Sequence, residues 1–215
     1  MYIELKDVSK KIKGSEVLKN VNCHFESGSV YGLKGKNGSG KTMLMRAICG
    51  LIKTKGEIDI NGEILGKNIS FPRSVGVLIE NPAFISGYTG KKNLQVLASI
   101  QKRIGDEEII STLKNVGLDP EDKRTYKKYS LGMKQRLGIA GAIMENPEIV
   151  ILDEPINALD ESGALQVRQI LKVQKERGAI IILACHDTEE LELLSDEIIT
   201  ISEGTIVGRE VLNKE

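Results

Sequence analysis

The chain has 215 residues, with 30 Lys and Arg against 30 Asp and Glu, so its formal net charge is zero. This length suits one domain with a substantial core, and the neutral balance gives no bulk electrostatic reason to expect nucleic acid as a partner. No apolar run approaches the roughly 20 residues that span a bilayer, and the N-terminus lacks a signal-peptide pattern, so we expect a soluble chain. Cys23, Cys49 and Cys185 lack metal-type spacing, which indicates buried free thiols in a reducing cytosol.

The first part of the chain alternates apolar and polar residues and is rich in β-branched types. This pattern predicts half-buried strands over residues 2–8 and 17–25 and a short apolar strand over 30–33. A further strand over 57–60 precedes Asn61-Gly62, a pair typical of a tight hairpin turn.

A complete phosphate-binding loop of the form G-x-x-x-x-G-K-[ST] follows the strand at 30–33. Its residues are Gly35, Lys36, Asn37, Gly38, Ser39, Gly40, Lys41 and Thr42. Glycines let successive N–H groups curl around one anion, and a helix that starts near Gly40 points its positive end at the same place. Lys41 can reach the β- and γ-phosphates, and the Thr42 hydroxyl can ligate Mg²⁺. A helix over 43–49, ended by Gly50, supplies the strand–loop–helix context, so the sequence predicts nucleotide binding.

Three continuous apolar runs, at 75–79, 149–152 and 180–184, are typical of parallel strands covered on both faces. The chain between about 89 and 146 is mostly helical in pattern, and a last hairpin is expected around Glu203-Gly204. We therefore predict a single α/β domain over 1–215. Its core lobe, about 1–79 and 147–215, would be interrupted by a helical lobe at about 80–146.

Two acids, Asp153 and Glu154, follow the apolar strand at 149–152. The carboxyl ends of strands in open α/β sheets face the ligand crevice, so Asp153 is placed to hold Mg²⁺ through water. Glu154 beside it is a candidate base for the attacking water. Ser130 is a good N-cap for a helix running to about Glu145, which makes a second anion-binding helix end, although a capped helix alone carries no function.

Together these elements resemble ABC-type ATPases. The stretch from 130 to 135 is similar to the family's signature motif, commonly Leu-Ser-Gly-Gly-Gln, with Leu131 in place of the first glycine. Its residues are Ser130, Leu131, Gly132, Met133, Lys134 and Gln135. Downstream, the tripeptide Ala158, Leu159 and Asp160 resembles the D-loop, and His186 resembles the switch histidine that contacts the γ-phosphate. The resemblance implies a P-loop NTPase fold of ABC type, with a mixed sheet core, an N-terminal antiparallel β part and an inserted helical lobe.

The resemblance further implies the ATP-binding and ATP-hydrolysing subunit of an ABC transporter, cytoplasmic and peripheral at the inner face of the cell membrane, with ATP and Mg²⁺. Two copies, or one copy and a related ATPase, would pack head to tail. The P-loop of each would then meet the 130–132 turn of the other. Hydrolysis would drive a membrane-spanning subunit on a separate chain, docked at a groove near 81–89, and no nucleic acid partner is expected.

The chain departs from the family's usual pattern at two further site positions. Glu80 stands where the Q-loop glutamine is usual, and its carboxylate can still ligate Mg²⁺. Ile12 stands where an aromatic side chain usually stacks on adenine, so weak discrimination against GTP is expected. The segment 78–84 and the 130–135 stretch resemble ATPases of exporters tied to resistance or immunity against bacitracin and lantibiotics.

Two other readings are open at this point. One is a soluble ABC-type ATPase without a transporter, although repair members usually carry long coiled-coil insertions and translation members carry two tandem units. The other is a small-molecule P-loop kinase, which would need an acceptor pocket and an arginine-rich lid.

Overall fold

A computed structural model of the chain describes residues 1–212, which form two sheets and six helices. The strands are β1 (Tyr2–Ile12), β2 (Ser15–Glu26), β3 (Ser29–Lys34), β4 (Lys55–Ile60), β5 (Glu63–Ile64), β6 (Val75–Leu78), β7 (Ile149–Asp153), β8 (Ile180–Ala184), β9 (Glu197–Ser202) and β10 (Thr205–Val211). The helices are α1 (Lys41–Ile48), α2 (Gly90–Gln101), α3 (Asp106–Asn115), α4 (Leu131–Ile143), α5 (Glu161–Glu176) and α6 (Thr188–Leu194), with a 3-10 turn at Tyr126–Lys128. The last residues of the predicted core lobe, 213–215, lie outside the described residues.

The N-terminal strands form an antiparallel sheet in the order β2-β1-β4-β5. One face of it is apolar, because Ile3, Leu5 and Val8 of β1 are buried. The β4–β5 turn has positive φ at both Asn61 and Gly62, 53° and 88°, as a tight hairpin turn requires. This confirms the predicted antiparallel part.

A second, six-stranded sheet has the order β10-β9-β3-β8-β7-β6. Strands β6, β7, β8, β3 and β9 run parallel and β10 closes one edge antiparallel to β9. Every residue of β7 and β8 is buried, which explains their unbroken apolar sequences. Because β3, β7 and β8 are neighbours and parallel, the residues that follow them meet at one edge of the sheet.

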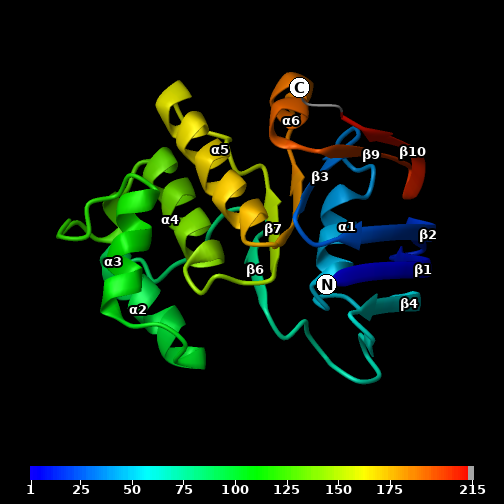
Figure 1. The fold of residues 1–215 in the computed structure, drawn as a ribbon, viewed down its shortest axis with the longest axis horizontal. Coiled ribbons are helices and arrows are strands. Elements are labelled where there is room, and N and C mark those ends of the chain that lie inside the picture. Colours follow the sequence, from blue (N-terminus) through cyan, green and yellow to red (C-terminus); the bar gives the residue numbers. More distant parts are fainter. Residues whose placement is uncertain (213–215) are drawn as a thin grey trace.

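Two apolar cores lie on the two faces of this sheet (Figure 1). On one face, α1 and the antiparallel sheet pack through residues such as Phe25 and Leu44. On the other face, α4, α5 and α6 pack through residues such as Leu137, Leu171 and Leu191, and α2 and α3 extend this side outward. The six-stranded sheet is therefore a rigid central layer that holds the loops at its carboxyl edge.

The middle of the chain is helical as predicted, with α2, α3 and α4 joined by non-helical segments at 102–105 and 116–125. Helix α4 begins after Ser130 and ends at Ile143, two residues before the expected end. Helices α5 and α6 were not among the predicted elements. The division into two lobes with bounds near 80 and 146 stays a prediction.

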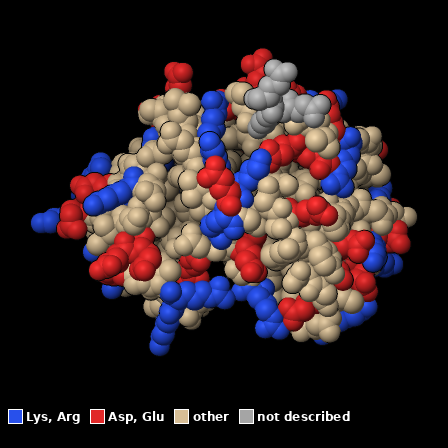
Figure 2. Space-filling model, viewed as in Figure 1, with Lys and Arg blue, Asp and Glu red and all other residues tan. Residues whose placement is uncertain are grey.

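The remaining general features concern thiols, membrane segments and charge. All three cysteines are free and buried, as expected. Within residues 1–212 no helix has the length and apolar character needed to cross a membrane. On the face shown in Figure 2, acidic and basic side chains are interspersed, without a broad area of one sign.

Candidate nucleotide site

The phosphate-binding loop lies between β3 and α1, where the sequence predicts it. Two of its glycines have no room for a side chain. A Cβ on Gly35 would come within 2.3 Å of the Ile201 carbonyl oxygen, and one on Gly40 within 2.9 Å of the Val17 carbonyl oxygen. Gly40 is the N-cap of α1 with φ of 114° and supplies no side-chain acceptor, so the first N–H groups of the helix are left for an anion.

Lys41 and Ser39 present polar groups to this loop. The Lys41 ammonium donates to the carbonyl oxygens of Gly35 at 2.7 Å and Lys36 at 3.3 Å, so it lies over the curl of the loop. Ser39 is 7% exposed, and its Oγ is one of the buried polar atoms in the described chain without a hydrogen-bond partner. A buried ammonium and an unpaired buried hydroxyl fit the oxygens of a phosphate group.

A cavity of about 470 Å³ opens over the loop. The loop residues from 37 to 42 line it together with Ile12 and Val17 of the antiparallel sheet, and with Asp153, Glu154 and His186 from the other side. Its size is that of small-molecule sites. The structure thus brings the predicted Ile12, carboxylates and histidine to the P-loop. Val17 is a lining residue that the sequence reasoning missed, since nothing in its local pattern distinguishes it from a core strand residue.

Thr42 and Asp153 meet at the floor of this cavity. The Thr42 hydroxyl donates to Asp153 Oδ2 at 2.8 Å, which joins α1 to the end of β7. Within residues 1–212 no cluster of three or more His, Cys, Asp and Glu side chains could hold a metal ion unaided. The pair instead fits Mg²⁺, which usually binds one or two protein oxygens together with substrate phosphates and water.

Glu154 and His186 lie side by side at the ends of β7 and β8. The Glu154 backbone N–H donates to the Ala184 carbonyl oxygen at 2.9 Å, and its φ is 52°. Its carboxylate accepts the His186 backbone N–H at 3.0 Å, and His186 Nε2 lies 3.5 Å from Oε1. Burial raises the pKa of Glu154, and the hydrogen bond from His186 opposes part of that rise. A half-buried carboxylate with a raised pKa can accept a proton from water.

At pH 8 the Glu154→Gln protein is expected to unfold at a higher temperature than the wild type. Because burial raises the pKa of Glu154 from its ordinary 4.5, ionisation costs more in the folded chain than in the unfolded chain. This cost is absent below the unfolded pKa, grows as the pH rises through the folded pKa and is complete above it. Thermal unfolding followed from pH 8 down to 4.5 should show the gap closing; a gap that stays constant or widens toward acid would contradict the raised pKa.

Glu80 follows β6 and has φ of 61°. It lines a second cavity, of about 300 Å³, together with Asp153, Glu154 and Leu131. Its carboxylate, however, accepts a hydrogen bond from the Arg46 guanidinium at 2.6 Å. The structure therefore places Glu80 on the same cavity as the other two carboxylates while its oxygen is bonded to a cation on α1. Arg46 is a residue of the site that the sequence reasoning missed.

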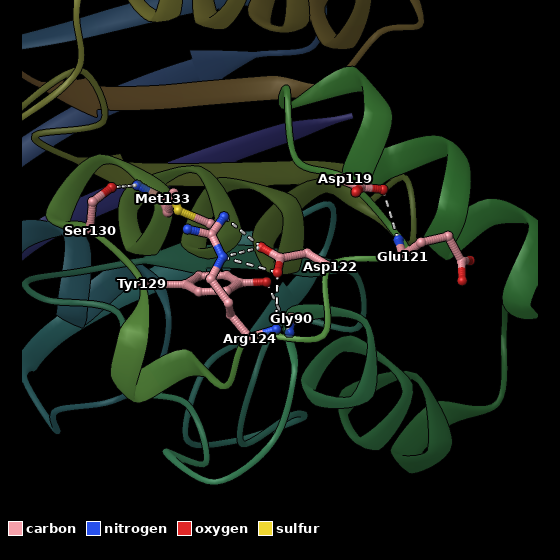
Figure 3. A network of polar contacts seen from close by, with 8 residues as sticks. All are labelled: Gly90, Asp119, Glu121, Asp122, Arg124, Tyr129, Ser130 and Met133. Atoms are coloured by element: carbon pink, nitrogen blue, oxygen red, sulfur yellow. Dashed lines mark hydrogen bonds and ion pairs between the residues drawn. The ribbon is translucent and has the colours of Figure 1, made fainter.

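The stretch from 130 to 135 begins α4 (Figure 3). The Ser130 hydroxyl accepts from the Met133 N–H at 3.2 Å, and Leu131 is 63% exposed. Gln135 turns inward instead: it is buried and donates to the Glu154 carbonyl oxygen at 2.8 Å. The cavity over the P-loop is lined by none of these six residues. Within one copy, the exposed start of α4 therefore lies outside the cavity over the phosphate loop.

The tripeptide 158–160 is the last part of the segment that connects β7 to α5. Asp160 is the N-cap of α5 and accepts from the Gly163 N–H at 3.0 Å, and it also lies 3.2 Å from the Arg136 guanidinium of α4. Ala158 has φ of 65°, and a Cβ on Gly132 would come within 3.0 Å of the Ala158 carbonyl oxygen. The predicted D-loop therefore packs directly on the start of α4, so the two motifs form one surface.

A strand, a glycine loop and a helix, with a hydroxyl on the helix hydrogen-bonded to a carboxylate at the end of another parallel strand of the same sheet, define a P-loop nucleoside triphosphatase. Residues 18–157 match the family model described as "ABC transporter". The chain therefore belongs to this family and is an ATP-binding and ATP-hydrolysing subunit of an ABC transporter.

Individual relatives agree with the family. The chain is 47% identical over 205 residues to an uncharacterised ABC transporter ATP-binding protein of Bacillus subtilis, covering 95% of this chain and 94% of that protein. It is 40% identical to the bacitracin transport ATP-binding protein BcrA of Enterococcus faecalis, covering 95% and 68%. It is 36% identical to the lantibiotic transport ATP-binding protein SrtF of Streptococcus pyogenes, covering 95% and 89%.

Solved structures show the same fold. An ATP-binding subunit of an ABC transporter superposes with a TM-score of 0.89 at 26% identity, covering 99% of this chain and 90% of that one. The dimeric structure of a bacterial ABC transporter cassette superposes with a TM-score of 0.87 at 26% identity, covering 99% and 100%.

Proposed function

We propose that two copies of the chain, or one copy and a related ATPase, close over two ATP molecules and drive an exporter of peptide antibiotics. The observation that carries this proposal is that the N-terminal ends of helices α1 and α4, both suited to bind anions, lie apart within one copy. The P-loop cavity contains no residue of the 130–135 stretch, and Leu131 at the start of α4 is exposed. A second copy placed head to tail would bring the P-loop of one copy and the start of α4 of the other copy to the same nucleotide. The dimeric cassette among the similar structures supports this arrangement, and the names of the bacitracin and lantibiotic transport relatives support peptide antibiotics as the transported class.

In this proposal each polar group of the site has one task. Lys41, Ser39 and the loop amides hold the phosphates. Thr42, Asp153 and Glu80 are the residues that would hold Mg²⁺, and the bound metal would neutralise phosphate charge. Glu154 takes a proton from the attacking water, and His186 contacts the γ-phosphate. The exposed residues of the 130–135 stretch would meet the nucleotide bound by the partner copy. Ala158, Leu159 and Asp160 would lie between the two copies.

The site contacts the base of the nucleotide more weakly than it contacts the phosphates. Ile12 is 37% exposed at the edge of the cavity, and an aliphatic side chain cannot offer the stacking energy of a ring. The phosphates and the metal therefore supply most of the binding energy, and we expect weak discrimination against GTP.

A separate membrane-spanning subunit would dock in a groove of about 580 Å³ beside the site. The groove lies between the chain after α1, the segment 81–84 and helices α2 and α4, and its lining is mainly apolar. The main apolar residues are Leu51, Ile52, Val77, Pro82, Phe84 and Leu97. An apolar groove of this kind fits the apolar face of a short helix. The docked chain would lie in the cytoplasm, peripheral at the inner face of the cell membrane.

A photocrosslinker on Leu51→Cys is expected to capture a multi-span membrane protein. Leu51 lines the groove and is 55% exposed, whereas burial raises the pKa of Cys23 to about 11 and of Cys49 to about 12, so the native thiols react poorly. The matched control is Val173→Cys, 57% exposed on α5. In membranes of cells that make the chain at native level, position 51 should crosslink and position 173 should not. Equal crosslinking, or no multi-span partner, would favour a soluble non-transport ABC-type ATPase.

A further inference from the structure

One ion pair connects the docking groove to the nucleotide site. Arg46 lies in the last turn of α1, the helix that Lys41 and Thr42 begin, and its guanidinium lies 2.6 Å from a Glu80 carboxylate oxygen. The Arg46 side chain lines the groove of about 580 Å³. Glu80 lines the cavity of about 300 Å³ that also holds Asp153 and Glu154. The pair therefore forms part of the wall between two spaces that the proposed function uses differently.

The pair is too exposed to be explained by folding stability. The side chains of Arg46 and Glu80 are 31% and 61% exposed, and pairs of this kind contribute little to the free energy of unfolding. Glu80 has positive φ although it is not glycine, so its backbone is held in an uncommon conformation next to the carboxylate cavity. The position of its carboxylate is thus set by the end of β6 and by the guanidinium together.

A guanidinium and a metal ion compete for the same carboxylate. Arg46 donates to a Glu80 oxygen through a charge-assisted hydrogen bond, and that oxygen must be freed or turned before it can ligate a divalent cation. We propose that Arg46 is a positioning residue that holds Glu80 away from the metal and so sets the metal concentration needed to form the nucleotide complex. This inference rests on the proposed function, because it takes Glu80 as a ligand of the Mg²⁺ that accompanies ATP.

The test measures metal binding directly. Mn²⁺ is titrated, with detection by electron paramagnetic resonance, into the full-length protein saturated with a non-hydrolysable ATP analogue. Arg46→Met should lower the Mn²⁺ concentration at half-saturation by about threefold to fivefold, the range that a partly exposed ion pair supplies. Met keeps the length and apolar stem of the side chain, so the groove wall stays filled.

Two controls separate this effect from a general loss of positive charge. In the Glu80→Gln background, Arg46→Met should change the half-saturation point much less, since the competing carboxylate is gone. Arg73→Met breaks a similar pair, Arg73 with Glu63 at 2.6 Å, and should change nothing. An equal shift in both Glu80 backgrounds, no shift or a shift to higher Mn²⁺ would overturn the role of Arg46. If the wild type failed to bind the analogue, the proposed function itself would fall.

Discussion

Glu154→Gln is expected to lower the rate of ATP hydrolysis by about 10²- to 10⁴-fold, the usual contribution of a general base, while ATP still binds. The reason is local. Glutamine can accept the His186 N–H as the carboxylate does at 3.0 Å, so the end of β7 keeps its geometry, but an amide cannot take a proton from water. Since Lys41, Ser39 and Thr42 are unchanged, the phosphate contacts remain. The closed pair of copies should therefore accumulate with ATP bound.

Phosphate release and light scattering after size-exclusion in MgATP measure the two halves of this prediction. The matched control is Glu145→Gln, beyond the end of α4 and outside the P-loop cavity, which should hydrolyse ATP as the wild type does. A Glu154→Gln protein that hydrolyses at the wild-type rate would remove Glu154 from the role of base. One that stays monomeric in MgATP would count against the closed pair.

Leu131→Glu is expected to abolish ATP-dependent pairing and to lower hydrolysis about 100-fold. The side chain is 63% exposed at the first position of α4, where a carboxylate stabilises a helix, so the monomer should fold. In the proposed pair, however, the same carboxylate would face the triphosphate bound by the other copy. Like charges brought together at an interface cost several kcal/mol, and 2.8 kcal/mol corresponds to about 100-fold.

Leu131→Gln is the control for this variant, because it has the same shape as glutamate without the charge. It should keep most of the pairing and hydrolysis, and Leu131→Gly, which restores the first glycine of the family's common motif, should do so as well. Both properties are read by light scattering and phosphate release in MgATP. If Leu131→Glu pairs and hydrolyses like Leu131→Gln, the start of α4 does not meet a nucleotide.

Much of the site could be predicted because its signals are local in sequence. The loop from 35 to 42 is recognised by the spacing of its glycines, Lys41 and Thr42. The structure shows why two of the glycines are required, because Gly35 and Gly40 have no room for a Cβ. The strand that ends at Asp153 is an unbroken apolar run because both of its faces are covered. In such cases the residue pattern and the tertiary constraint express the same requirement.

The parts that could not be predicted depend on distant neighbours. Helix α5 is an exception, because its buried Val167, Ile170 and Leu171 lie at helical spacing after the Asp160 cap, so its signal is local although the prediction lacks it. Val17 joins the nucleotide cavity only because β2 passes beside the loop. The partner of Glu80 lies 34 residues away on α1, and Gln135 looks like a free motif residue until its bond to the Glu154 carbonyl oxygen is seen. Sequence spacing carries no information on such contacts.

The central claim is that each ATP site is completed by a second copy of the chain, and mixing two inactive variants tests it most directly. Lys41→Ala has a disabled P-loop and an intact α4 start, whereas Leu131→Glu has the reverse. Each alone should be inactive in phosphate release. The mixture should recover activity, because a mixed pair contains one complete site made from the Leu131→Glu P-loop and the Lys41→Ala α4 start. A mixture no more active than its components, with both variants folded, would contradict the account.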